Sequence, residues 1–261
     1  MSTSHTIFTV NGPTAALTFN RPESRNAMTW AMYDALVTAC ETVEADPAIR
    51  VLILQGVDDG AFVAGTDISQ FEGLRTPEQA LAYETRLDHV IGVLERVSKP
   101  TIARVNGVAV GGGCVMAMAC DLRICGPSAR FGIPVARTLG NCLSASNCAR
   151  LMDLIGPARV KDLMFTGRLL DAHEALAVGL ATQVVDGDAL DRVVTETAAR
   201  IAANAPLTIA ATKEMVRRLQ VHRRGAADAA DDLVTTCYTS QDFHNAVGAF
   251  MAKRPPVWTG A

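Results

Sequence analysis

Three consecutive glycines, Gly111 to Gly113, separate a β-branched run from a small apolar segment and constrain this chain more than any other feature. Val105 to Val110 is typical of buried strand, and Cys114 to Ala119 of a short buried helix. Residues without Cβ let a ligand approach the main chain, and the first turn of the helix supplies unpaired N–H donors. Such a junction can hold an enolate or a tetrahedral oxyanion. The glycines can equally serve only close packing, so a second feature must decide.

The glycine spacing argues against the usual nucleotide-binding loops. The dinucleotide fingerprint G-x-G-x-x-G fails because Gly111 and Gly113 are followed by Met116 rather than by a third glycine. The sequence also contains no G-K-S/T phosphate loop. Nucleotide binding of the usual kinds is therefore not expected.

Composition indicates an ordinary enzyme-sized chain. Its 261 residues, 49% of them hydrophobic, can bury a large core, and the net charge of −3 argues against general nucleic-acid binding. No apolar run approaches the roughly 20 residues that cross a bilayer, and Met1 to His5 does not resemble a signal peptide. Seven cysteines without C-x-x-C spacing favour reduced thiols over disulfides or a zinc site. We therefore expect a cytoplasmic protein without metal, whose small core residues include Cys40, Cys114, Cys120 and Cys125.

Local patterns predict an α/β core followed by helices. Thr6 to Val10 and Thr14 to Phe19 alternate around Asn11-Gly12 and predict a hairpin, while Thr29 and Thr76 are expected helix N-caps. These two helices should end at Asp46-Pro47 and Ser98. Further strands are expected at Val51 to Gln55, Thr101 to Asn106, Leu122 to Cys125 and Leu180 to Val185. Further helices are expected at Ala145 to Leu154, Ala158 to Phe165, after an Asp171 cap, and at Ala189 to Asn204 and Leu207 to Gln220, with the last sixty or so residues all helical.

The deciding second feature is the segment Ala61-Phe62-Val63-Ala64-Gly65-Thr66-Asp67-Ile68, which follows the expected strand Val51 to Gln55. Together with the glycine segment it resembles the crotonase superfamily, also called the enoyl-CoA hydratase/isomerase family. Members of this family carry A-F-x-A-G-x-D-I and N-G-x-A-x-G-G-G about this far apart. Further matches, which extend the resemblance over nearly the whole chain, are Asn20-Arg21-Pro22, Asn26-Ala27-Met28, Lys99-Pro100, Ala129 to Gly132 with Pro134, Ala249-Phe250 and Lys253-Arg254.

The resemblance implies an architecture and a ligand. Residues 1–200 would form a ββα spiral core with an acyl-CoA site, and residues 201–261 a helical region that packs trimers, commonly paired into hexamers. The CoA thioester would be the substrate, with no separate cofactor and neither nucleic acid nor membrane as a partner. Periodicity alone indicates only an α/β core followed by helices.

The resemblance also implies site residues. Two main-chain N–H groups, those of Ala64 and Gly112, would polarise the thioester carbonyl. The segment Thr66, Asp67 and Ile68 would contact pantetheine and adenine, although Asp67 can instead simply cap a turn. Arg25 and Lys253 would lie near the CoA phosphates, and for both cations solvated surface charge is an equally good account. Ala27 would also belong to the substrate-binding residues.

Departures from the family pattern concern proton transfer. Family hydratases carry one glutamate two residues after the third glycine and another after the proline of F-G-x-P. These positions are Val115 and Val135 here, and neither valine can transfer a proton, although both can line the substrate site. Gly140 to Ser144 also departs from the usual L-G-x-x-P-G-x-G-G. Polar residues there that could reach the acyl group are Arg137, Asn141, Cys142 and Ser144.

Two functions remain open from the sequence. The first is an enzyme that stabilises a thioester enolate or tetrahedral intermediate. Its reaction could be isomerisation, hydrolysis, a lyase reaction or an atypical hydration. A Cys142 nucleophile would need a neighbouring base, and no sequence motif names one, since the five histidines are scattered. The second is a non-catalytic acyl-CoA-binding or assembly subunit that retains the glycine turn.

Overall fold

Two sheets form the centre of the molecule. The computed structural model describes residues 4–224 and 228–261. The larger sheet has strand order β1-β2-β3-β4-β6-β9, in which β1 and β2 are antiparallel and the remaining neighbours are parallel. Its strands are β1 (Thr6–Asn11), β2 (Thr14–Phe19), β3 (Val51–Gly56), β4 (Thr101–Val105), β6 (Leu122–Cys125) and β9 (Gln183–Val184). The smaller sheet consists of β5 (Val108–Val110), β7 (Arg130–Gly132) and β8 (Leu170–Asp171).

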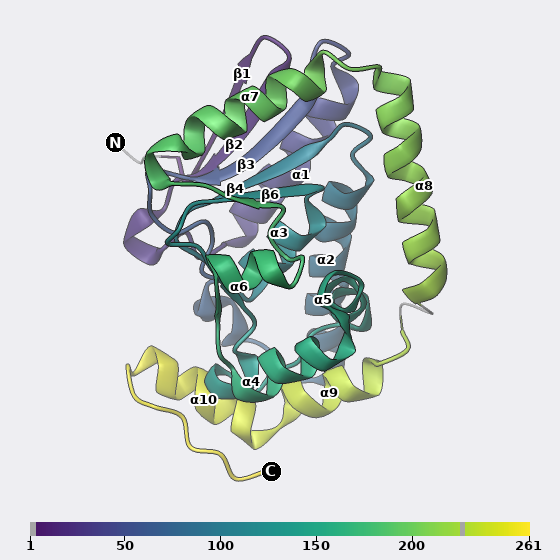
Figure 1. Cartoon of the computed structure of the whole chain (residues 1–261). Coiled ribbons are helices and arrows are strands. Elements are labelled where there is room, and N and C mark those ends of the chain that lie inside the picture. The colour runs from purple at the N-terminus through teal and green to yellow at the C-terminus, as the bar shows by residue number, and fades with distance from the viewer. Residues whose placement is uncertain (1–3, 225–227) are drawn as a thin grey trace.

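Helices cover both faces of the larger sheet. Alternate side chains of β3 point in opposite directions, so Leu52 and Leu54 join the main core while Val51 and Ile53 pack against α7 (Leu190–Ala202). Helix α7 lies across one face and α1 across the other (Figure 1). The helices of the main-core side are α1 (Trp30–Ala45), α2 (Pro77–Arg96), α3 (Gly112–Ala119) and α5 (Ala145–Thr166). This two-sided burial explains the continuous apolar run of β3.

The predicted helix starts are confirmed by hydrogen bonds. The Thr29 hydroxyl accepts from Met32 N–H, and Thr76 and Gln79 form a reciprocal capping box. A second capping box pairs Asp171 with Glu174 at the start of α6 (Ala172–Ala177). The expected break at Gly156 is also present, since its φ of 74° is non-helical and divides α5 into two helical stretches.

Several expectations from the sequence are corrected. The strand expected to run through Asn106 ends at Val105, and β5 begins after a bend at Asn106 and Gly107, where Gly107 has a positive φ of 68°. The strand expected over 180–185 is only the two-residue β9, because the preceding residues form a turn after α6. The domain boundary between residues 200 and 201 stays a prediction, and it would fall within the last turn of α7.

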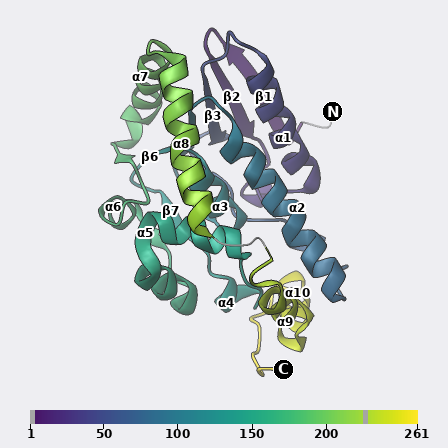
Figure 2. The same cartoon turned by 90° about the vertical axis from the view of Figure 1, so that its right-hand side faces the viewer.

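The C-terminal part contains three helices, α8 (Pro206–Arg224), α9 (Asp231–Thr239) and α10 (Gln241–Met251). Helix α8 runs along the side of the molecule, while α9 and α10 lie together at its lower end (Figures 1 and 2). The expectation of helix to the end of the chain is wrong beyond Met251, where Pro255 and Pro256 follow. The tail is tied back by the Asp242 carboxylate, which accepts from Thr259 N–H at 2.8 Å.

Within the described residues no helix is both long and apolar enough to cross a membrane. The same part of the chain holds no cluster of three or more histidine, cysteine, aspartate or glutamate side chains arranged for a metal ion.

Candidate functional site

The glycine turn places an unpaired amide at the start of a buried helix. Gly111 has a positive φ of 55°, which leaves Gly112 as the first residue of α3. The Gly111 N–H donates to the Gly132 carbonyl at 2.9 Å, but among the described residues the Gly112 N–H has no acceptor. Close packing also operates here, since a Cβ on Gly113 would lie 2.1 Å from the Val63 carbonyl oxygen. Close packing therefore accounts for Gly113, while the donor role of Gly112 stays a prediction.

The first motif runs beside this turn. Val63 bridges Ala109 in parallel fashion, and on its other side Thr66 bridges Met28. Segments 25–28, 63–67 and 108–112 therefore lie side by side. A Cβ on Gly112 would lie 3.4 Å from the Thr66 hydroxyl, so the two predicted motifs do meet.

The second predicted amide already has a partner. The Ala64 N–H donates to the Arg25 carbonyl at 3.1 Å. Arg25 and Asn26 both have positive φ, 51° and 57°, in which non-glycine residues are strained. The Asn26 side chain holds this conformation by donating to the Ala61 carbonyl at 2.7 Å and accepting from Arg21 N–H at 2.8 Å.

Asp67 caps a turn, as one interpretation of the sequence held. Its carboxylate accepts from Ser69 N–H at 3.1 Å at the start of a short 3₁₀ helix, Ile68–Phe71, and from Arg21 at 2.6 Å. Partial burial raises the pKa of the Asp67 carboxyl, but these hydrogen bonds and the Arg21 charge outweigh it, and the net pKa is lowered. Asp67 is therefore an ionised structural group, and Arg21 is its partner.

Three buried hydroxyl groups meet next to Gly112. Thr66 accepts from the Tyr83 hydroxyl at 3.0 Å and lies 2.8 Å from the Tyr33 hydroxyl. A Cβ on Gly112 would approach the Tyr33 oxygen to 2.7 Å, so the group directly borders the turn. Three hydroxyl hydrogens serve two hydrogen bonds, which leaves one O–H uncommitted. Tyr33 and Tyr83 come from α1 and α2, and no sequence motif marks them.

The other predicted substrate contacts divide between surface and interior. Arg25 and Lys253 are exposed and form no ion pair with any described residue, whereas Ala27 and Ile68 are half-buried. Val115 is buried one turn into α3. Val135 is buried at the start of α4 (Val135–Thr138).

Cys142 is poorly placed for a nucleophile. A hydrogen bond with the Cys237 side chain and partial burial raise the pKa of the Cys142 thiol, while the same contact lowers that of Cys237. The Cys142 Sγ lies 3.7 Å from the Leu233 carbonyl. An activated cysteine needs the opposite, an environment that stabilises its thiolate.

Asn141 leads to a buried carboxyl that the sequence analysis missed. The Asn141 amide donates to the Tyr238 hydroxyl at 3.0 Å, and Tyr238 donates to Glu84 Oε1 at 2.5 Å. Glu84 is only 6% exposed, and burial raises the pKa of Glu84 to about 7. The signal was present: Ala80, Glu84, Leu87 and Ile91 share one helical face, so a charged residue interrupts an apolar stripe.

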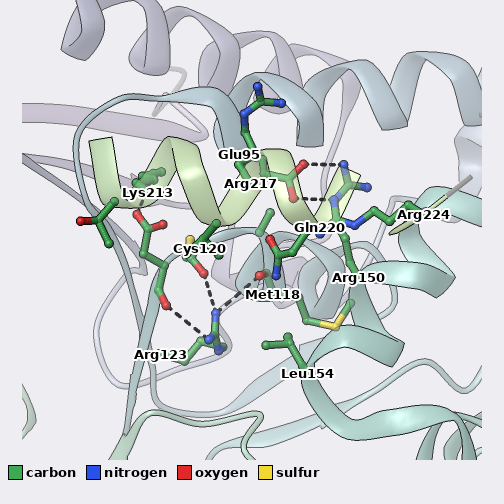
Figure 3. A pocket seen from close by; sticks show the side chains of 14 residues that line it. Glu95, Met118, Cys120, Arg123, Arg150, Leu154, Lys213, Arg217, Gln220 and Arg224 are labelled. Carbon is green, nitrogen blue, oxygen red and sulfur yellow. Dashed lines mark hydrogen bonds and ion pairs between the residues drawn. The ribbon is translucent and has the colours of Figure 1, made fainter. Parts of the chain in front are cut away.

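A cavity of about 220 Å³ opens at the opposite end of α3 (Figure 3). Its charged side chains pair with one another. Glu95 accepts from Arg150 at 3.0 Å and from Arg224 at 2.7 Å, and Lys213 lies 2.6 Å from Asp121. This cavity is separated from Gly112 by the length of α3, about 12 Å. It is therefore distinct from the site at the glycine turn.

Comparison with known proteins identifies the family. The family model "Enoyl-CoA hydratase/isomerase" matches residues 10–261. The chain belongs to the enoyl-CoA hydratase/isomerase family. It is 34% identical to a short-chain-enoyl-CoA hydratase of Clostridium acetobutylicum, over 97% of both chains. An enoyl-CoA hydratase/carnithine racemase structure from Magnetospirillum magneticum is 34% identical, with a TM-score of 0.81 over 100% of this chain and 97% of the other.

A methylmalonyl-CoA decarboxylase in complex with 2-nitronate-propionyl-CoA is also similar in structure. It is 28% identical, has a TM-score of 0.90, and the match covers 100% of both chains. The α/β crotonase-like fold with C-terminal helices, inferred from the motifs, is thereby confirmed. Family membership extends through the terminal helices, because the match reaches residue 261.

The buried carboxyl predicts a pH dependence of stability. Because the folded pKa of Glu84, about 7, lies above its ordinary value of 4.5, folding favours the protonated form. This contribution is complete below about pH 4.5 and is lost as the pH rises through about 7, and the shift corresponds to about 3 kcal/mol. Urea unfolding between about pH 5 and 8 should show a steeper loss for wild type than for Glu84→Gln. Parallel curves would contradict this assignment.

Proposed function

We propose that this protein is an enzyme that acts on an acyl-CoA and stabilises a thioester enolate or tetrahedral intermediate through the amides of Gly112 and Ala64. The observation that carries the proposal is the Gly112 N–H, which starts a buried helix without an acceptor among the described residues. Gly112 itself is half-buried, so a ligand can reach its N–H and supply the missing acceptor. The positive end of the α3 dipole favours the negative charge that develops on the acyl oxygen.

Ala64 becomes the second donor when the Arg25 carbonyl gives way. The strained conformations of Arg25 and Asn26 support this movement, because strain at two adjacent residues lowers the cost of rearranging them. The incoming thioester oxygen then replaces one carbonyl acceptor by another, so the Ala64 N–H is never left unpaired.

The rest of the CoA molecule would lie along the same segments. Ala27, Thr66, Asp67 and Ile68 belong to the neighbouring segments 25–28 and 63–67, and we assign the pantetheine and adenine contacts to their main chain. The exposed cations Arg25 and Lys253 are assigned to the CoA phosphates. Val115 and Val135 would supply apolar walls for the acyl group.

The reaction is not the two-glutamate hydration of an enoyl-CoA. The valine side chains at positions 115 and 135 cannot transfer a proton, and the site instead presents hydroxyl groups of Tyr33, Thr66 and Tyr83.

The competing proposal is a non-catalytic acyl-CoA-binding subunit. Turnover of any CoA thioester would exclude it, whereas binding without turnover across a broad panel would favour it. A covalent role for Cys142 has little support from its raised pKa.

The closed homo-oligomer implied by the family is also a proposal. Helix α8 has no buried residue, and several large apolar side chains on it are exposed, including Leu207, Met215 and Leu219 at 83%, 63% and 63%. Such a surface is suited to a subunit contact.

The seven cysteines are free, which agrees with the cytoplasmic location that we propose.

Removing the Gly112 donor should abolish most turnover. Proline is tolerated at the first position of a helix, so Gly112→Pro deletes the N–H with limited damage to α3. We expect a loss of about 10² to 10³ in kcat on any substrate that turns over. Gly112→Ala is the matched control, since it keeps the N–H and introduces the same crowding against Tyr33. Equal rates of the two variants would refute the donor role.

Hydration of crotonyl-CoA should be very weak or absent. Each general acid or base contributes roughly 10² to 10⁴-fold, so the loss of both outweighs what the amides retain. The loss of enoyl-thioester absorbance measures the rate directly. A kcat near or above about 10 per second would overturn this reading of Val115 and Val135.

Light scattering should give the mass of a trimer or hexamer. Leu219→Glu places a charge on the exposed apolar surface of α8 and should shift the protein toward smaller species. A wild-type monomer at micromolar concentration would rule out the proposed assembly.

A further inference from the structure

A cluster of three polar side chains is linked to the proposed acyl site through Tyr83, whose ring lies 5.9 Å from that of Tyr238, but the cluster takes no part in the proposed oxyanion hole. Glu84 comes from α2, Asn141 from the segment after α4, and Tyr238 from α9. Tyr83, which precedes Glu84, donates to Thr66 at 3.0 Å. Helix α2 therefore connects the cluster directly to the hydroxyl groups beside the glycine turn.

Two hydrogen-bond acceptors of the cluster, Glu84 Oε2 and Asn141 Oδ1, have no donor in the part of the chain that the structure describes. Tyr238 gives its single hydroxyl hydrogen to Glu84 Oε1, so its oxygen can only accept from Asn141. This fixes the orientation of the Asn141 amide, with Nδ2 toward Tyr238 and Oδ1 on the other side. Glu84 Oε2 and Asn141 Oδ1 are both buried and have no partner among the described residues. The Ser144 amide lies beside the Glu84 carboxyl without completing a hydrogen bond to Oε2.

Aromatic rings enclose the cluster. The ring of Tyr238 lies 4.9 Å from that of Phe243, 5.9 Å from that of Tyr83 and 6.4 Å from that of Phe71, measured between centroids. Glu84 and Tyr238 are buried, so solvent does not reach them freely. Two unpaired acceptors in apolar surroundings are costly, and a ligand group that donates hydrogen bonds would remove that cost.

We propose that Glu84 and Asn141 form a specificity site for an acyl group that carries a hydrogen-bond donor, of which a hydroxyl group is the simplest. The inference rests on the proposed acyl-CoA function and adds the substrate class. The thioester oxygen is held at Gly112, while the hydroxyl of the acyl chain donates to Glu84 Oε2 or Asn141 Oδ1. Glu84 and Asn141 thereby determine which acyl group binds, while the amides of Gly112 and Ala64 stabilise charge on the thioester oxygen.

The test compares matched ligands on the intact protein. Saturated acyl-CoA esters of short to medium chain length are titrated calorimetrically, each beside its hydroxyacyl and oxoacyl counterparts of equal length. The titrations are made at about pH 8.5, above the pKa of Glu84 of about 7, so that its carboxylate is ionised and Oε2 can only accept. For at least one chain length the hydroxyacyl ester should bind about tenfold or more tightly than the unsubstituted one, because only it pairs the buried acceptors. The oxoacyl ester has the same shape near that position but cannot donate, so it should show no gain.

Glu84→Gln supplies the decisive variant. It keeps the oxygen that accepts from Tyr238 and replaces Oε2 by a donor, so preference should shift from the hydroxyacyl toward the oxoacyl ester. Asp88→Asn is the matched control. Asp88 lies one turn further along α2, its pKa is also raised by burial, and its Oδ1 already accepts from Ser144 and Asn147 at 2.8 Å. This control should retain the wild-type preference, because it changes charge without altering the unpaired acceptors.

The outcomes distinguish a failure of the specificity site from a failure of the proposed acyl-CoA function. If unsubstituted esters bind but the hydroxyl group adds nothing in wild type, the specificity site is wrong and the proposed function stands. If no CoA ester binds, both fail. If Glu84→Gln keeps the wild-type preference for the hydroxyacyl ester, the hydroxyl group is recognised elsewhere and the inference is wrong. The wild-type comparison decides the matter even if the variant folds poorly.

Discussion

Burial of α3 from its second residue onward is the constraint on which the proposed site depends. In a helix buried from Gly113 to Ala119, polar groups at the ends are costly unless something pairs with them. At the carboxyl end Arg123 donates to the carbonyls of Ala117 and Cys120, at 3.1 and 2.5 Å, and also to that of Leu180. Burial lowers the pKa of Arg123, yet these acceptors surround its charge. At the amino end no described side chain plays the same part for the Gly112 N–H, which is why the proposed site for the acyl oxygen lies there.

Where the determining interactions are local, the sequence predicts the fold well. The N-caps Thr29, Thr76 and Asp171 each accept a hydrogen bond from the main-chain N–H three residues later. The residues that predict each helix start are therefore close together in the sequence. The short strands of the smaller sheet lack such signals. They span two or three residues each, and their pairing depends on where the bend at Gly107 directs the chain.

The candidate site divides along the same line. The segments containing Ala64 and Gly112 were found because each is a contiguous motif, and the structure brings those segments together. The side chains that surround them were missed, since Tyr33, Glu84 and Tyr238 come from three helices and meet only through tertiary packing. The Ala64 hydrogen bond to the Arg25 carbonyl was equally beyond the sequence, because it depends on two consecutive residues of positive φ.

The distribution of polar groups limits which reactions the site can support. A reaction that begins with proton abstraction needs a base near the acyl carbons, and by the family resemblance Val115 and Val135 stand where hydratases would carry one. Glu84 is not an immediate replacement, since its Oε1 is committed to Tyr238. A reaction that forms the enolate by breaking a carbon–carbon bond needs no base at all, only donors for the oxygen and a later source of a proton. The uncommitted hydroxyl hydrogen among Tyr33, Thr66 and Tyr83 lies beside Gly112, within the proposed site. Under the proposed function, oxyanion stabilisation combined with hydroxyl donors would favour chemistry in which the substrate generates its own carbanion.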